Sequence, residues 1–415
     1  MDLKSNILCI VTSIMLTCTG CVNISANGGI ADGSVSNQSE NRSSTLTDSY
    51  SITQSKDSTL ESVEVPPTQS SITTMELSEG SSIRYQQLNS TQKAVYDEVY
   101  NGIKEYQDTI NISETINESD LSVIYDALIN TAYFELVQPT RKYDFKYDSI
   151  TGNIYKICPS YIVAQSVRDD MMNATNSVAN YILSQVATMN DFEKIRYFHD
   201  YIVTHCSYDD SGQNFSNAYG ALVEEKAVCE GYSRAFKYLC DMANIPCELV
   251  IGETDIDHMW NLVQVDGDWY HIDVTWDDPK NKDGDYISYT YFNLTDEEIF
   301  RDHTILDTAK FPEANSTRMN YYTYNGLVGS STEEVYNILC DQVYKACMDG
   351  SKYVYVKASN KSVYKEALET LSNDSWYAMF NIINNASNSA GIEIKNQNIV
   401  CGYDDVMYTI TVTLY

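Results

Sequence analysis

A cysteine, a histidine and an aspartate follow one another along the chain in an order that suits covalent acyl chemistry. Cys229 begins a segment with helical spacing, and His258 and Asp273 follow on two segments with strand-like composition. A thiolate can attack a carbonyl carbon, an imidazole can move the proton, and a carboxylate can orient the imidazole. These residue types predict a cysteine nucleophile that forms a thioester intermediate.

The segment after Cys229 predicts the helix that would activate this thiol. Apolar residues recur there at intervals of three and four, which is typical of one buried helical face. They are Tyr232, Ala235, Phe236, Leu239, Met242 and Ala243. Cys229 is therefore expected in the first turn, where backbone amides and the helix dipole favour a thiolate. The carboxylate of Glu230 opposes this effect, so a cationic partner is needed as well.

A predicted hairpin supplies that partner. Two β-rich segments flank Asp266-Gly267, which is a strong signal for a two-residue turn. Counting outward from this turn places His258 and Asp273 on the same face as diagonal neighbours, with backbones about 7 to 8 Å apart. A carboxylate-imidazole hydrogen bond is within reach at that separation, and it would orient the ring toward Cys229.

Other histidines offer alternative readings. His271 shares the predicted face of Asp273 and ranks second as base, because a position two residues away on one strand suits an orienting bond poorly. Asp191 is expected to cap a helix in which His199 is a core histidine and His205 lies near the helix end. A cysteine at a helix start also has a structural reading, as a small buried hydrophobe.

At these residues the chain resembles the transglutaminase-like superfamily. The matching blocks are Ala-Val-Cys-Glu-Gly-Tyr-Ser at 227–233, His-x-Trp-Asn at 258–261 and Trp-Tyr-His-x-Asp-x-Thr-Trp-Asp-Asp-Pro at 269–279. The resemblance spans residues 191–279, roughly a fifth of the chain. It implies an α+β fold with a papain-like core, in which a helix bearing the cysteine packs on an antiparallel sheet bearing the histidine and the aspartate. It also implies Cys229 as nucleophile, His258 as base and acid, and Asp273 as orienting carboxylate.

The oxyanion of a tetrahedral intermediate needs hydrogen-bond donors. The backbone amide of Cys229 at the helix start is the natural first donor. Tyr219, just upstream, is a candidate for the second, although a tyrosine in the core is the favoured reading of that residue.

The amino terminus predicts secretion and anchoring. Lys4 precedes an apolar stretch at 7–16, which is too short to span a bilayer but suits a signal peptide. Gly20-Cys21 resembles a bacterial lipoprotein signal with Cys21 as the lipidated residue, although Cys18 stands where leucine is usual. We therefore expect an extracytoplasmic protein that is anchored to the membrane by lipid, with simple secretion as the alternative.

A spacer follows the leader. From residue 22 to residue 74, 20 of the 53 residues are serine or threonine, and Tyr50 is the only aromatic residue among them. Such a composition cannot build a core and predicts a disordered tether.

The amino-acid composition limits the classes of partner that the chain is expected to bind. The 27 basic and 58 acidic residues give a net charge of -31, which disfavours nucleic acid. After the leader, the sequence contains neither a C-x-x-C pair nor an EF-hand loop, so no metal site and no cofactor are predicted. Reduced, mostly buried cysteines are expected after the leader.

Five regions are predicted. They are a signal peptide (1–21), a tether (22–84), a mainly helical region with strand-like residues at 143–161 (85–190), the catalytic core (191–312) and a small α/β domain (313–415).

The favoured function is a surface-tethered cysteine enzyme that hydrolyses amide bonds in peptides or proteins, with cell-wall peptide as a substrate suggested by location. The alternatives are a protein cross-linking transglutaminase and a binding or surface-assembly module without catalysis.

Overall fold

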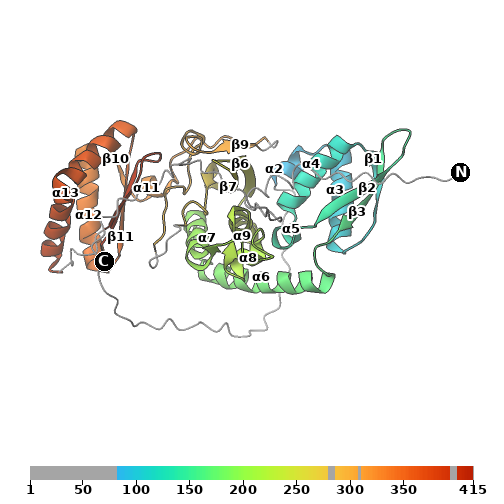
Figure 1. Ribbon diagram of the computed structural model, residues 1–415, viewed down its shortest axis with the longest axis horizontal. Coiled ribbons are helices and arrows are strands. Elements are labelled where there is room, and N and C mark those ends of the chain that lie inside the picture. The colour runs from blue at the N-terminus through green and yellow to red at the C-terminus, as the bar shows by residue number, and fades with distance from the viewer. Residues whose placement is uncertain (1–81, 279–285, 307–309, 393–399, 415) are drawn as a thin grey trace, which may run out of the picture. The chain divides into compact units, whose positions relative to one another are not determined.

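The computed structural model describes residues 82–278, 286–306, 310–392 and 400–414, which form two compact units (Figure 1). The first unit contains the described residues up to 327, and the second contains those from 328 onward. Residues 313–327, which the sequence grouped with the C-terminal domain, lie in the first unit, where the amide of Ala314 donates to Asp296.

The first unit alternates helices and short strands. Its helices are α2 (Ile83–Gln87), α3 (Ser90–Lys104), α4 (Glu118–Thr131), α5 (Tyr133–Val137), α6 (Gln165–Gln185), α7 (Asp191–His205), α8 (Ala218–Leu222), α9 (Cys229–Met242), α10 (Asp296–Ile299) and α11 (Tyr321–Tyr324). Its strands are β1 (Ile110–Ile116), β2 (Lys142–Tyr147), β3 (Ile154–Ser160), β4 (Ser207–Tyr208), β5 (Lys226–Ala227), β6 (Cys247–Glu253), β7 (Asp257–Val265), β8 (Asp268–Ile272) and β9 (Thr304–Ile305).

The N-terminal part of this unit holds more sheet than the sequence predicted. Strands β2 and β3 confirm the strand-like pattern at 143–161, and β1 joins them in an antiparallel sheet of order β1-β3-β2. The pattern missed β1 because only its three isoleucines are buried among polar residues. Helices α3 and α4 share a hydrophobic core with this sheet.

The site is built on a second antiparallel sheet, of order β8-β7-β6-β9. Helix α9 packs against β6 and β7, and α7 and α8 pack against α9 (Figure 1). Eleven of the fourteen residues of α9 are buried, as expected of a helix enclosed on several sides. A helix beginning at the cysteine and packed on an antiparallel sheet is the predicted α+β arrangement, which is thereby confirmed.

The hairpin formed by β7 and β8 has the predicted register. Val265 pairs with Asp268, and Asn261 pairs with Ile272. Asp266 and Gly267 take left-handed φ angles of 51° and 88°, the backbone geometry of a two-residue type I′ turn. A strand period of two then fixes which side chains share a face.

The helix before the site begins one residue earlier than the sequence suggested. Asn190, and not Asp191, is the N-cap of α7: its side chain accepts from the amide of Glu193, and the Glu193 carboxylate accepts from the amide of Asn190. Asp191 is the first helical residue, where its charge suits the helix dipole.

The second unit is the predicted small α/β body. It contains β10 (Val328–Gly329), α12 (Thr332–Asp349), β11 (Tyr353–Ala358), α13 (Lys361–Ala390), β12 (Val400–Asp404) and β13 (Thr409–Thr413). The strands form one sheet of order β10-β11-β13-β12, and the two helices lie side by side against β11 (Figure 1).

The predicted signal peptide, Cys21 and most of the tether lie outside the described residues. The final residues of the predicted tether belong to the fold, since Ile83 begins α2 and the buried Arg84 pairs with Asp126. Among the described helices, none is long and apolar enough to cross a membrane.

Candidate active site

Cys229 lies at the start of α9, as predicted. Its neighbour Val228 is the N-cap and donates its amide to the carbonyl of Phe215 at 2.9 Å. A side chain on Gly231 would collide with that same carbonyl, so glycine is needed for this close approach. Cys229 is 7% exposed, and it lies where the helix dipole favours an anion.

The carboxylate of Glu230 is neutralised within the same helix. Arg234, four residues later, donates from Nε and Nη2 to Glu230 Oε1 at 3.0 and 2.9 Å. The guanidinium is buried and also donates to the carbonyl of Glu135. The expected repulsion between Glu230 and a Cys229 thiolate is therefore largely compensated.

Two polar side chains tie the cysteine turn to the histidine strand. Ser233 Oγ lies 2.9 Å from the carbonyl oxygens of both Cys229 and Met259. Asn261 donates from Nδ2 to the carbonyl of Ser233 at 3.0 Å. Met259 adjoins His258 on β7, so these bonds fix the start of α9 against the strand that carries the imidazole.

His258 and Asp273 meet as the hairpin count predicted. His258 Nε2 lies 2.7 Å from Asp273 Oδ2, and both side chains are buried. The other carboxylate oxygen accepts from the amides of Thr275 and Trp276 at 3.0 and 3.2 Å. These bonds hold the Asp273 carboxylate in one orientation.

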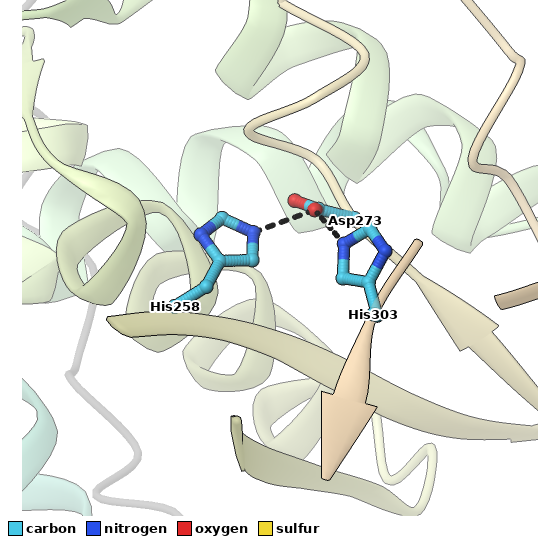
Figure 2. Close-up of side chains that lie close together, drawn as sticks. All are labelled: His258, Asp273 and His303. Atoms are coloured by element: carbon cyan, nitrogen blue, oxygen red, sulfur yellow. Dashed lines mark hydrogen bonds and ion pairs between the residues drawn. The ribbon is translucent and has the colours of Figure 1, made fainter. Parts of the chain in front are cut away.

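A second imidazole shares this carboxylate. His303 Nε2 lies 3.2 Å from Asp273 Oδ2, and Figure 2 shows the carboxylate between the two rings. Burial alone would raise the pKa of Asp273, but the nearby His258 and His303 hold it well below its usual range. Asp273 is therefore a carboxylate throughout the neutral pH range.

No pattern in the sequence indicates a role for His303. Its Nδ1 lies 2.6 Å from Asp302 Oδ1, and the hydroxyl of Tyr291 donates to the other oxygen of Asp302 at 2.7 Å. Burial lowers the pKa of His303, but the bonds to Asp273 and Asp302 outweigh it and raise the pKa to about 9. The ring is therefore charged at neutral pH.

His271, the second-ranked base, is engaged elsewhere. Its Nδ1 accepts from Trp260 Nε1 at 3.0 Å, and its Nε2 lies 2.8 Å from Asp296 Oδ1. Burial lowers the pKa of His271 and outweighs the bond to Asp296, so the ring is neutral. Both ring nitrogens thus serve contacts that join β7, β8 and α10.

Three side chains could reach a common metal ion. The ligand atoms of His258, Asp273 and His303 lie within 4.8 Å of one another, the one such group of three among the described residues. Both imidazoles, however, approach the same carboxylate oxygen at hydrogen-bonding distance. We interpret the group as a hydrogen-bonded network.

The other residues that the sequence indicated lie in α7, α8 and the cysteine-bearing elements. Tyr219 is half-buried in α8, which packs on α9, and its role as an oxyanion donor stays a prediction. None of the described cysteines forms a disulfide. His205 Nδ1 lies 2.9 Å from the carbonyl of Tyr201 at the end of α7.

His199 is the satisfied core histidine that the sequence indicated. It is fully buried, with Nδ1 2.9 Å from Asp200 and Nε2 3.2 Å from Asp277, the residue that ends the 273–277 turn. Burial lowers the pKa of His199, but these two bonds outweigh it and raise the pKa from 6.5 to about 9. A raised pKa in the folded state stabilises the fold fully below about pH 6.5 and less as the pH rises through 9.

Replacing His199→Leu should therefore cost stability in a pH-dependent way. At pH 6 we expect the free energy of unfolding to fall by about 3 kcal/mol, because Asp277 loses a charged partner in the interior. At pH 9.5 the difference from the wild type should be clearly smaller. Urea unfolding at both pH values tests this, and an equal loss at both would contradict a charged His199.

Comparison with known proteins agrees with this architecture. Residues 177–274 match the model of the transglutaminase-like superfamily, so this part of the chain is a transglutaminase-like domain. The kyphoscoliosis peptidase of Homo sapiens is 25% identical over 138 residues, which cover 29% of this chain and 20% of that protein. The chain therefore spans about a fifth of the length of this relative.

Two solved structures are also similar to the chain. A TGase crystal structure has a TM-score of 0.25 at 15% identity and covers 42% of this chain and 52% of its own. A candidate cysteine protease from Cytophaga hutchinsonii has a TM-score of 0.24 at 12% identity, with coverage of 43% and 80%.

Proposed function

We propose that the chain is a cysteine acyl enzyme that hydrolyses amide bonds of peptides or proteins, with Cys229 as nucleophile, His258 as base and acid, and Asp273 as orienting carboxylate. The observation that carries the proposal is the bond between His258 Nε2 and Asp273 Oδ2, on a strand tied to the turn of Cys229. With Nε2 engaged, Nδ1 is the ring nitrogen that would take the thiol proton.

The residues would act in two steps. The Cys229 thiolate attacks the carbonyl carbon, the carbon-nitrogen bond breaks, and the leaving amine takes its proton from the His258 imidazolium. His258 then removes a proton from water, whose oxygen attacks the thioester carbon and releases the Cys229 thiolate and a carboxylic acid. The amide of Cys229 is the proposed first oxyanion donor and the Tyr219 hydroxyl the second.

Hydrolysis is favoured over cross-linking because water is the most abundant acyl acceptor, and one edge of the buried site is exposed to it. The ring of His258 lies 5.9 Å from Trp276, which is 38% exposed. Water can therefore reach the edge of the site and take the acyl group. An amine acceptor would instead give a cross-link, which is the alternative outcome.

A product analysis separates these outcomes. The full chain is incubated with β-casein and a biotinylated primary alkylamine, and the products are read by mass spectrometry. We expect cleaved or deamidated casein peptides and little biotin incorporation, and chain alkylated at Cys229 serves as the blank. Predominant biotin incorporation would assign cross-linking, and no change above the blank with casein or a mixed peptide library would favour the binding module.

The leader motivates a proposal about location. We propose extracytoplasmic anchoring through a lipid on Cys21, supported by the apolar stretch at 7–16 and the tether that follows. Cell-wall peptide is the substrate class that this location suggests. In bacterial cells, a Cys21→Ala chain should leave the membrane fraction, and a chain that remains there would contradict lipidation.

A further inference from the structure

The carboxylate of Asp273 serves two imidazoles, although the proposed reaction uses only one. His258 and His303 approach the same oxygen, at 2.7 and 3.2 Å, and the centres of their rings lie 5.5 Å apart (Figure 2). The proposed reaction assigns no role to His303.

We propose that His303 is a positioning residue, which orients the Asp273 carboxylate and adds a fixed positive charge that sets the pH range in which the Cys229 thiolate and the His258 imidazolium coexist. This inference rests on the proposed function, because it concerns the pair that would do the chemistry.

The fold holds His303 firmly in this position. Strand β9, which follows it directly, pairs with β6 through Gly252 and Ile305, and Gly252 also pairs with His258 on the other side. A side chain on Gly252 would collide with the carbonyl of Thr304 and with the Trp260 ring. The glycine thus allows β9 to pair closely with β6, which on its other side pairs with the strand that carries His258.

Aromatic side chains enclose the His303 ring. Its centre lies 4.6 Å from Trp276, 5.1 Å from Trp260 and 5.6 Å from Tyr291. The ring is fully buried, so its two nitrogens depend on protein partners. Those partners, Asp273 and Asp302, are both carboxylates, an arrangement that requires a proton on each nitrogen and hence a charged ring.

The ionisable groups around His303 come from several segments. Asp302 precedes it in the chain, and Tyr291 contacts Asp302. His258 lies on β7, and Asp273 directly follows β8. The neutral His271 of β8 also interacts with His303, whose charge helps to lower the pKa of His271. His303 therefore supplies a positive charge beside the proposed catalytic histidine.

That charge has a predictable direction of effect. A cation next to His258 disfavours the imidazolium form of His258, and it favours the thiolate form of Cys229. Both limbs of the pH profile therefore lie at lower pH than they would with a neutral residue at position 303. At the separation of the two rings, the effect should be about one pH unit.

The test uses the full chain with His303→Gln, which keeps a donor and removes the charge. Alkylation of Cys229 by iodoacetamide, and amide turnover, are measured against pH with EDTA present to exclude metal inhibition. We expect both profiles to move upward by about one pH unit. A role in packing alone would lower rates or stability without moving the profiles, so superimposable profiles would overturn the proposal.

A measurement on the wild-type chain covers the case in which this variant does not fold. Nitrogen NMR of the imidazole rings is feasible because the chain has only five histidines. The His303 ring is identified by its contact with Tyr291 and should be doubly protonated at pH 7.5. A neutral ring would overturn the proposal.

The proposed function fails separately from this inference. It fails if wild-type Cys229 shows no acid-shifted alkylation that depends on His258. The assignment of His303 fails if that alkylation is present but does not respond to His303→Gln.

Discussion

Replacing Cys229→Ala is expected to lower amide turnover by about 10⁴-fold or more, because the covalent step loses its nucleophile. The same variant should lose covalent labelling by iodoacetamide at mildly acidic pH. The fold should be kept, since alanine fits at a buried helix start and the bonds of Ser233 use the backbone of residue 229. Turnover of the casein probe and peptide mass spectrometry measure both effects.

Cys158→Ala is the matched control for this prediction. Cys158 lies in β3, is more exposed than Cys229, and has no part in the proposed reaction. Its replacement should leave turnover and acid-range labelling unchanged. If Cys158 or another cysteine takes the label at the same rate as Cys229, the assignment of the nucleophile is wrong.

Asp273→Asn should retain the fold yet lose turnover by about 10⁴-fold, the effect of the corresponding change in a serine protease triad. The remaining amide oxygen can still accept from Thr275 and Trp276, whose bonds hold the turn. The amide NH₂ would then face the nitrogens of His258 and His303, which in the wild type donate hydrogen bonds to Oδ2. His258 is thereby driven to the wrong tautomer. Turnover and near-UV circular dichroism measure activity and fold.

Asp200→Asn provides a carboxylate control for that change. Asp200 contacts the buried His199 as Asp273 contacts His258, but the proposed reaction does not use it. Turnover should stay close to the wild-type value. Near-wild-type turnover in Asp273→Asn would remove Asp273 from the proposed triad.

The contact between His258 and Asp273 could be predicted because a two-residue turn fixes which residues of the two strands pair. Asp266-Gly267 leaves one register for the hairpin, and a period of two then assigns each side chain to a face. The helix start at Cys229 could be predicted as well, since helical spacing begins there. Both features depend on residues that are close together in the sequence.

His303 could not be found in the same way. It reaches Asp273 through β9, a strand of two residues, and no sequence pattern fixes the register of so short a strand. Gly252 carried a usable signal, because a glycine inside a strand often marks the close approach of another backbone. The ion pair between Glu230 and Arg234 could also have been predicted, since residues four apart share a helix face.

Strand β1 shows a different limit of sequence reasoning. Its sequence is polar except for three isoleucines, and its burial depends on the neighbouring β3 and α3. Context of this kind overrides strand propensity, which is weak by itself.

The proposed function depends on a thiolate-imidazolium pair formed by Cys229 and His258. We would measure the rate of Cys229 alkylation by iodoacetamide in the full chain and in His258→Ala, from roughly pH 5 to pH 9, by peptide mass spectrometry. If the pair forms, we expect fast labelling of Cys229 in the acidic range in the wild-type chain and its loss in His258→Ala. Labelling that rises only near pH 8.5, and equally in both chains, would contradict it and favour the binding module.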